Sequence, residues 1–241
     1  MRIYANARQL MSEIFRDVLE MGIKVHPHSM QNKIVEGDEN FATLEITNYG
    51  YCLTAIPDED YLFLFEDTKA WCQAELAERV SPTPVNPGEA WKLRPETWAQ
   101  FMVGGKFEYT YNQRFNSYGG LVKILNEIHK NPDSRQLILS VWDRSDVHFL
   151  GGKSRVPCSI YYQFLLRNGK LDIIYNQRSA DVVTHFGNDI WLAFNLMKWV
   201  VDQVNSAWNM GIHYGWLYHN IGSLHCYNKD LNTLKQCVDE I

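Results

Sequence analysis

Apolar side chains recur every three or four positions in the first part of the chain. Over residues 6–21 this spacing predicts a packing helix, with Asn6 placed to cap its start and Gly22 just beyond its end. Over residues 41–56 apolar and polar positions alternate instead, which predicts strands, and the Asn-Tyr-Gly sequence at 48–50 predicts a turn between them.

The middle of the chain returns to helical spacing. A helix is predicted over 58–80, and the prolines and the glycine between 82 and 88 then predict a surface loop. A further helix is predicted over 117–130, followed by a buried strand over 136–142. The polar residues 143–156 predict a loop.

The strongest local signal is a hairpin. Two alternating stretches, 158–167 and 171–178, are separated by an Asn-Gly pair that favours a tight two-residue turn. Strands that leave a tight hairpin run antiparallel, so their far ends finish side by side. We therefore expect Cys158 and Arg178 to lie at the same end of a sheet.

The longest helical pattern covers residues 188–208, and its apolar stripe predicts the central buried helix. A last strand is expected over about 214–227, followed by a polar terminal helix. Strands and helices mixed without regular alternation favour an α+β layered fold over a doubly wound parallel sheet. We interpret residues 1–241 as a single domain.

Composition narrows the kind of partner. With 241 residues, 46% of them hydrophobic, the chain can bury one sizeable core. A net charge of −5 disfavours binding to duplex nucleic acid, so an anionic ligand would need a local arginine cluster. Of eight histidines only His26 and His28 are close together, and no Cys or carboxylate lies near them at ligand spacing, so we expect no metal site.

The cysteines and the apolar runs bear on localisation. There are five cysteines, an odd number, and no apolar leader follows Met1, which favours a reducing cytoplasm. No apolar run approaches the roughly 18 residues that a membrane span requires. We expect a cytoplasmic protein that makes no membrane contact.

A cysteine such as Cys158 is by itself more often a core residue than a nucleophile. Its companions change the interpretation, because several short motifs follow one another along the chain: Asn131-Pro-Asp-Ser-Arg135, Pro157-Cys158, Gln177-Arg-Ser-x-Asp181 and His225-x-Tyr227. Together they resemble the thymidylate synthase superfamily, well over about 105–230 and loosely over 1–100.

The resemblance implies a fold and an activity. The fold is a thymidylate synthase-like layered domain in which a mixed sheet packs on a long central helix and one sheet face forms a homodimer interface. The activity is one-carbon transfer from 5,10-methylenetetrahydrofolate to C5 of a pyrimidine nucleoside monophosphate. A thiolate adds to C6 because C5 alone is too weak a nucleophile.

The resemblance also assigns roles to individual residues. Cys158 is the expected nucleophile, and a nearby arginine would favour its thiolate form. Arg135 is expected to reach the phosphate bound by the neighbouring subunit. The other substrate-binding residues implied by the motifs are Arg178 and Ser179 at the phosphate, Gln177 in the same motif, His225 and Tyr227 at the sugar, and Tyr111 lining the site.

Two carboxylates are assigned less directly. Glu75, in a stretch that resembles the glutamate region of the family, is expected to relay protons and to position water. Asp181 either binds the folate or orients the loop that follows it. Strand alternation would place Cys226 on the opposite face from His225 and Tyr227, in the core.

Asp189 separates this chain from the usual members of the family. It lies eight positions after Asp181, where thymidylate synthases place an asparagine that matches the O4 and N3–H of uracil. An ionised carboxylate only accepts hydrogen bonds, so it fits the 4-amino group of cytosine. In this respect the chain resembles the deoxycytidylate hydroxymethylases of phage type. If the adjacent Asn188 faced the base instead, its amide would match uracil and the expected substrate would be a uracil nucleotide.

Two features favour water over hydride at the final step. Ser159 stands where the family commonly has histidine, and the chain ends at Ile241, soon after Tyr227. The leading interpretation is a deoxycytidylate 5-hydroxymethyltransferase. A C5-methyltransferase acting on dCMP or CMP, an ordinary thymidylate synthase, and a nucleotide- or RNA-binding relative without turnover remain as alternatives.

Overall fold

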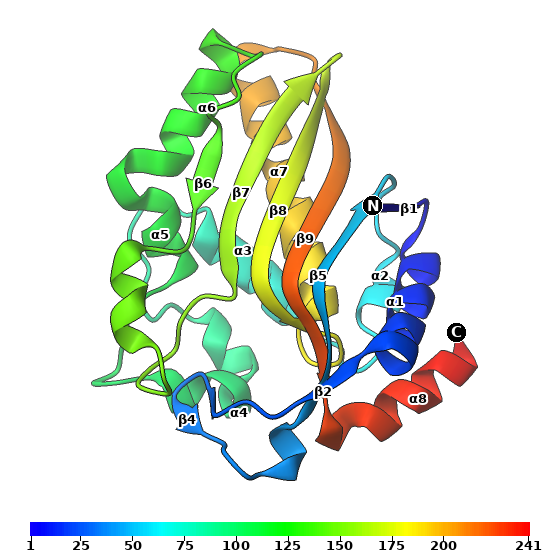
Figure 1. The fold of residues 1–241 in the computed structure, drawn as a ribbon. Coiled ribbons are helices and arrows are strands. Elements are labelled where there is room, and N and C mark those ends of the chain that lie inside the picture. The colour runs from blue at the N-terminus through cyan, green and yellow to red at the C-terminus, as the bar shows by residue number, and fades with distance from the viewer.

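The computed structural model describes the backbone of residues 1–241 and every side chain except that of Glu240. Its core is a seven-stranded sheet in the order β1-β5-β9-β8-β7-β6, with β2 paired to β5 (Figure 1). The β1–β5 and β8–β9 pairs are parallel and the others antiparallel, so the predicted mixed sheet is confirmed. The strands are β1 Arg2–Tyr4, β2 Ile23–Val25, β5 Thr43–Leu53, β6 Ile138–Ser140, β7 Ser159–Arg167, β8 Lys170–Asp181 and β9 His213–Tyr227.

The α-helices are α1 Ala7–Met21, α2 Glu59–Leu62, α3 Lys69–Arg79, α4 Pro95–Trp98, α5 Tyr111–Asn116, α6 Gly120–Lys130, α7 Phe186–Trp208 and α8 Leu231–Glu240. A small separate hairpin pairs β3 Ser29–Met30 with β4 Lys33–Ile34. Short 3₁₀ segments lie at Glu39–Phe41, Ala90–Leu93, Ala99–Phe101, Ser117–Gly119, Arg144–Phe149 and Asn228–Asp230.

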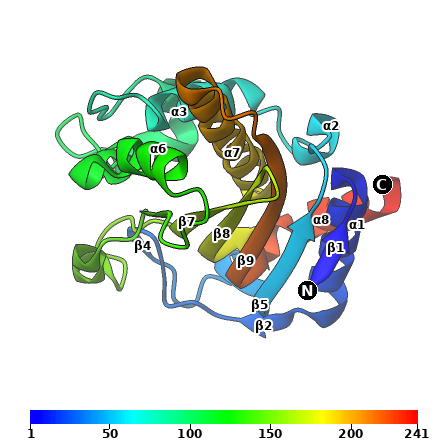
Figure 2. The same cartoon turned by 90° about the horizontal axis from the view of Figure 1, so that it is seen from above.

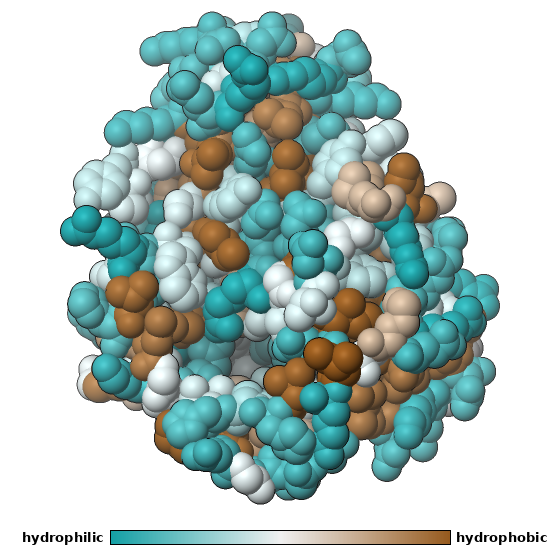
Figure 3. Space-filling view, in the orientation of Figure 1, coloured by the Kyte–Doolittle hydropathy of each residue, from teal (hydrophilic) through white to brown (hydrophobic). Residues whose placement is uncertain are grey.

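Helix α7 is the predicted central helix. It lies behind the sheet in Figure 1, and the view from above shows α3 and α6 on the same side (Figure 2). Most of its residues are buried, as expected for a helix whose apolar positions surround the axis. The opposite face of β7, β8 and β9 carries no helix (Figure 1), and in the same orientation its surface mixes apolar and polar side chains (Figure 3).

Local sequence chemistry explains the best-predicted elements. Asn6 caps α1 by accepting a hydrogen bond from the backbone N–H of Gln9 at 2.8 Å. Asn168 and Gly169 both adopt positive φ, 51° and 72°, as a two-residue type I′ turn requires. The predicted hairpin is therefore confirmed, with β7 and β8 antiparallel from Arg167 opposite Lys170 to Ser159 opposite Gln177.

Tertiary pairing overrides the turn predicted at 48–50. The segment is one continuous strand, β5, paired with β9 from Thr43 opposite Tyr227 to Leu53 opposite Leu217. Asn48 does adopt a positive φ of 56°, but it introduces an irregularity in the strand without reversing the chain. The turn prediction was wrong because the long partner strand β9 holds both halves of β5 in one register.

The helix predicted over 58–80 is interrupted. It forms as α2 and α3, because α2 docks against the start of α7: a Cβ on Gly187 would lie 1.8 Å from the carbonyl oxygen of Leu62. Only a glycine permits this approach. Two other boundaries also differ, since β6 is shorter than the predicted 136–142 and α6 begins at Gly120 after an irregular turn. Across the described chain, none of the helices combines the length and apolar character needed to cross a membrane.

Candidate active site

Cys158 and Arg178 meet at the end of the β7–β8 hairpin, as predicted. The backbone N–H of Arg178 donates to the Cys158 carbonyl at 2.8 Å, and an Nη2 donor of Arg178 lies 3.9 Å from the Cys158 Sγ. The Cys158 side chain is half-buried, and Gln31 from the β3–β4 hairpin donates to its Sγ at 3.7 Å. The thiol therefore has one cationic and one amide donor beside it.

A β-bulge follows Cys158. Ser159 pairs with Gln177, yet Tyr161 pairs with Asn176, so Ile160 is an extra residue in β7. Bulges next to functional sites re-aim the neighbouring side chains. Here the bulge lets Ser159 turn inward, where its Oγ accepts from the Tyr111 hydroxyl at 2.9 Å and lies 2.6 Å from the Tyr175 hydroxyl.

Asp189, in the first turn of α7, is held against the sheet. Its Oδ2 accepts a hydrogen bond from the Gln177 side-chain amide at 2.6 Å. The carboxylate keeps a little exposed surface, but packed atoms exclude most of the water around it. This burial raises the pKa of Asp189 to about 6, against the opposing effects of the Gln177 hydrogen bond and the positive charge of Arg79.

Asn188 points elsewhere. Its Oδ1 accepts from the Thr68 hydroxyl and lies 3.5 Å from the Cys72 thiol, both on the α3 side. Its Nδ2 faces the Thr184 carbonyl at 3.5 Å, and the side chain is only 4% exposed. The polar atoms of Asn188 are thus used within the packing between α3 and α7, whereas Asp189 contacts Gln177.

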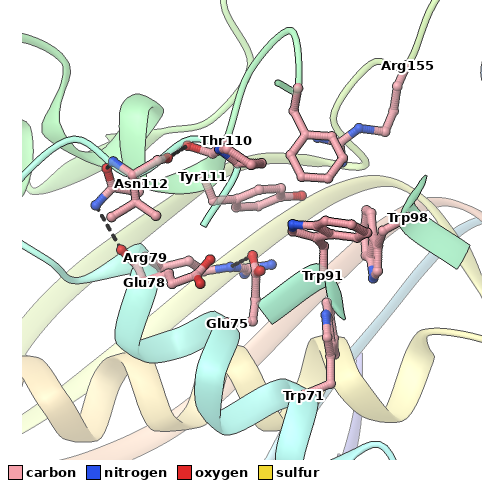
Figure 4. Close-up of a pocket in the computed structure, with 13 residues that line it drawn as sticks. Trp71, Glu75, Glu78, Arg79, Trp91, Trp98, Thr110, Tyr111, Asn112 and Arg155 are labelled. Atoms are coloured by element: carbon pink, nitrogen blue, oxygen red, sulfur yellow. Dashed lines mark hydrogen bonds and ion pairs between the residues drawn. The ribbon is translucent and has the colours of Figure 1, made fainter. Parts of the chain in front are cut away.

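Glu75 and Arg79 occupy successive turns of α3. Arg79 Nε donates to Glu75 Oε1 at 2.8 Å, and the Arg79 guanidinium lies 3.9 Å from the centre of the Tyr111 ring. Figure 4 shows both side chains projecting from α3 toward Tyr111. Arg79 is only 7% exposed, so its charge acts in a region of low dielectric. Tyr111 in turn reaches Ser159, the first residue of β7, which connects this ion pair to the residue that follows Cys158.

A cavity opens beside the ion pair. It measures about 470 Å³ including the part continuous with solvent, and Glu75, Arg79, Tyr111 and Arg155 contribute to its wall. Three tryptophans also line it, and Trp71 and Trp98 are stacked at 5.5 Å (Figure 4). The buried indole N–H groups of all three have no hydrogen-bond partner among the described residues: Trp71, Trp91 and Trp98. An aromatic wall of this kind suits a flat heteroaromatic ligand.

His225 and Tyr227 share one face of β9, with ring centres 5.1 Å apart. Cys226 is fully buried, so its predicted place in the core is confirmed. Burial raises the pKa of the Tyr227 phenol. Asp181 lies opposite His225 in the β8–β9 register, and its Oδ1 accepts from the backbone N–H of Val183 at 3.1 Å, an arrangement that orients the chain toward α7.

Two other predicted residues lie at the margins. Ser179 accepts from an Nη1 donor of Arg178 at 3.4 Å, so it stays beside the arginine of its motif. Arg135 is exposed, and its carbonyl accepts from Gln163 at 3.0 Å. No hydrogen bond or ion pair within the described part of the chain joins the Arg135 side chain to the other candidate site residues.

The histidines considered for a metal do not gather ligands. His26 lies 3.4 Å from Glu39, and His28 lies 3.1 Å from Glu36, each as a separate exposed pair. Among the residues whose side chains are described, no group of three or more His, Cys, Asp or Glu is placed to hold a metal ion.

Sequence reasoning missed several contributors to the site. Gln31, Arg79 and His219 all contact predicted residues. Gln31 and His219 belong to elements far from their partners in the sequence, whereas Arg79 lies on the same helix as Glu75. The only available signal was the spacing of Glu75 and Arg79, which are four residues apart and so form a pair on one helical face. Gln31 lies in a short hairpin whose two-residue strands carry too little pattern to predict.

The fold and the site together define a layered α+β domain with a cysteine and an arginine at the end of one hairpin and an aromatic cavity lined by Tyr111 and Arg155. Comparison with known proteins gives the class its name. Residues 87–240 match the family model described as thymidylate synthase, so the chain belongs to the thymidylate synthase family.

A relative agrees with this assignment. The bifunctional dihydrofolate reductase-thymidylate synthase of Paramecium tetraurelia is 29% identical over 145 residues, which cover 60% of this chain and 29% of that protein. This chain therefore matches less than a third of the length of that relative. The matched family region includes every predicted site residue except Glu75.

The position of Arg79 predicts an electrostatic effect on Asp189. Replacing Arg79 by glutamine removes a positive charge that lowers the pKa of Asp189, so this pKa should rise above its present value of about 6. A ¹³C NMR titration of the side-chain carboxyl groups measures it, with the Asp189 signal assigned by its loss in Asp189→Asn. Lys69→Gln, on the exposed start of the same helix, is the matched control and should leave the pKa unchanged. An equal shift in both variants would contradict the expectation.

Proposed function

We propose that this protein transfers a one-carbon unit to C5 of deoxycytidylate and releases 5-hydroxymethyl-dCMP. Membership of the thymidylate synthase family supports folate-dependent chemistry on a pyrimidine nucleotide. The observation that carries the choice of base is Asp189: its carboxylate contacts Gln177, whereas the neighbouring Asn188 amide is used in packing. An acceptor at this position matches the 4-amino group of cytosine.

Cys158 is assigned the role of nucleophile. Its sulfur adds to C6 of the base and later leaves, so that the carbon–sulfur bond exists only during the reaction. Arg178 places a guanidinium donor 3.9 Å from this sulfur. Arg178 and Ser179 are assigned to the phosphate, because a guanidinium can bind two phosphate oxygens at once. His225 and Tyr227 are assigned to the sugar.

The aromatic cavity is assigned to 5,10-methylenetetrahydrofolate. The aromatic wall that Trp71, Trp91 and Trp98 give this cavity suits a flat pteridine ring. When bound there, the folate supplies a carbon at the oxidation level of formaldehyde. Glu75 lies in the same cavity and, with Arg79, is assigned to hold the water that completes the product and to take up its proton. Asp181 is assigned to orienting the loop below this cavity.

Water rather than hydride is proposed for the last step. Adding a methylene unit and a water in place of the C5 hydrogen gives a hydroxymethyl group with no change of redox state, whereas a methyl product requires a hydride. Ser159, with the hydroxyls of Tyr111 and Tyr175, forms a polar cluster beside Cys158. Such a cluster suits an ordered water.

A product analysis tests the reaction. With methylenetetrahydrofolate and dCMP, mass spectrometry should show a gain of CH₂O on the nucleotide, and CMP and dUMP should react more slowly. A gain of CH₂ instead would assign a methyltransferase, and preferential conversion of dUMP would assign a thymidylate synthase. Binding without any product would favour a relative that has lost turnover.

The matched control for the nucleophile is a pair of serine variants. Cys158→Ser should abolish product formation, with a loss of at least about a thousandfold, and should still bind dCMP. Cys237→Ser, in the remote helix α8, should keep its activity. Turnover by Cys158→Ser would remove this residue from its assigned role.

Base recognition is tested at Asp189. Asp189→Asn should shift the ratio of kcat/KM for dCMP and dUMP toward dUMP by at least about tenfold, because an amide can donate to O4. For the unchanged protein, kcat/KM for dCMP should fall as the pH drops below about 6, where Asp189 becomes protonated and ceases to be a pure acceptor. In Asp189→Asn this fall of kcat/KM at low pH should be absent. If Asp189→Asn kept both the dCMP to dUMP ratio of kcat/KM and the fall at low pH, the assignment of Asp189 to the base would be wrong.

We also propose a homodimer formed through the open face of the sheet. Apolar side chains on this face are partly exposed, including Trp216 at 40%. The amide Nδ2 of Asn176 on the same face is buried and has no partner among the described residues. The exposed Arg135 is assigned to the phosphate site of the neighbouring subunit, which accounts for its lack of contacts with its own site.

A mixing experiment tests this assembly. Arg135→Ala and Cys158→Ser should each be nearly inactive alone. After unfolding and refolding together, the mixed dimers should contain one intact site and restore about a quarter of the normal activity. Arg144→Ala, which alters an exposed arginine of the 143–156 loop, is the control. It should be active by itself, before it is mixed with a second variant. A protein that sediments as a monomer, or a mixture that stays inactive, would contradict the proposal.

A further inference from the structure

A single line of hydrogen bonds runs from Asp189 into the interior of the sheet. Gln177 Nε2 donates to Asp189 Oδ2 at 2.6 Å, and Gln177 Oε1 lies 2.9 Å from His219 Nε2. The other ring nitrogen of His219, Nδ1, lies 2.9 Å from the Tyr51 hydroxyl. These four residues come from α7, β8, β9 and β5, and the inner three are at most 2% exposed. We call this set the Tyr51–Asp189 relay.

We propose that His219 and Tyr51 are positioning residues for base recognition, which fix the orientation of the Gln177 amide and thereby hold Asp189 as a hydrogen-bond acceptor. The proposal rests on the proposed reading of the base by Asp189. Neither His219 nor Tyr51 touches the substrate in this assignment, because both act through Gln177.

The chemistry of the donors gives the relay one direction. An ionised carboxylate only accepts, so the NH₂ of Gln177 must face Asp189 and the carbonyl must face His219. His219 must then carry its proton on Nε2, which leaves Nδ1 as an acceptor for the Tyr51 hydroxyl. Each buried group between Tyr51 and Asp189 is satisfied in this arrangement.

The surroundings keep His219 neutral and immobile. Its ring lies parallel to Tyr175 at 4.5 Å and to Phe186 at 6.0 Å, while Tyr51 meets it edge-on. Burial lowers the pKa of His219 to about 3 and raises that of Tyr51 well above its ordinary value. The imidazole therefore stays uncharged and the phenol stays protonated, as the stated direction requires.

Reversal of the relay would change what Asp189 offers to the base. If His219 carried its proton on Nδ1, the lone pair of Nε2 would face Gln177 and favour the flipped amide. The Gln177 carbonyl would then face the carboxylate, which is tolerable only if Asp189 is protonated and donates. The single proton of Asp189 would then lie in its hydrogen bond to Gln177, and only an uncharged carbonyl oxygen would remain as an acceptor for the base, so the preference for a 4-amino group would weaken.

The experiment compares matched hydroxyl deletions. Tyr51→Phe removes the donor that selects the tautomer, and it should lower the dCMP to dUMP ratio of kcat/KM by about three- to tenfold, the range expected for one hydrogen bond. Tyr4→Phe is the control, since Tyr4 is equally buried and its ring contacts Tyr51 edge-on at 6.1 Å, outside the relay. It should leave the ratio unchanged. Equal ratios in both variants would overturn the proposal.

The tautomer is measured directly by ¹⁵N NMR of the intact protein. The His219 signals should show a proton on Nε2 in the unchanged protein and in Tyr4→Phe, with a mixture of tautomers in Tyr51→Phe. His219→Phe keeps an aromatic ring in the stack and should lose the dCMP preference to a similar extent. A proton found on Nδ1 in the unchanged protein would overturn the proposal even where a variant fails to fold.

Combining Tyr51→Phe with Asp189→Asn distinguishes a failure of the Tyr51–Asp189 relay from a failure of base recognition by Asp189. If Asp189→Asn shifts the ratio but Tyr51→Phe does not, the relay fails while the proposed function stands. If Asp189→Asn has no effect on the ratio, the reading of the base by Asp189 fails first. When both are correct, Tyr51→Phe should cause no further shift in the Asp189→Asn background.

Discussion

The site depends on placing a carboxylate where little water reaches it. Removing an ionised group from water is costly unless hydrogen bonds or opposite charges replace the water. Here the compensation comes from two sources on different elements, the Gln177 amide on β8 and the Arg79 charge on α3. The contact between the sheet and α7 is therefore polar at this point, although the rest of the interface is apolar.

Strand alternation distributes the proposed chemistry of β8 over its two faces. Gln177 points inward to Asp189 and His219, whereas Arg178 lies on the other side, with its guanidinium at the backbone carbonyls of Val156 and Pro157. One dipeptide can thus serve the base and the phosphate of one nucleotide. The inward face is rigid because aromatic rings stack along it from Tyr162 through Tyr175 to His219.

Local signals predicted the elements that local chemistry determines. The Asn168-Gly169 turn, the Asn6 cap and the apolar stripe of α7 each followed from a few neighbouring residues. The motif at 177–181 supplied three of the proposed substrate contacts, Gln177, Arg178 and Ser179. Asn48 and the 58–80 helix were misjudged because their conformations are set by partners distant in sequence, β9 in one case and Gly187 in the other. For the same reason no pattern near Gln177 could reveal His219, which joins it only through the parallel pairing of β8 with β9.

The backbone contacts of Arg178 couple anion binding to the nucleophile. Its Nε donates to the Pro157 carbonyl, its Nη2 to the Val156 carbonyl and its Nη1 to Ser179. An incoming anion must share or displace donors that now tether the segment leading into Cys158. Occupancy at Arg178 and the freedom of the sulfur to move are consequently linked equilibria, so a ligand that bears only a phosphate group would already alter the reactivity of the thiol toward an alkylating reagent.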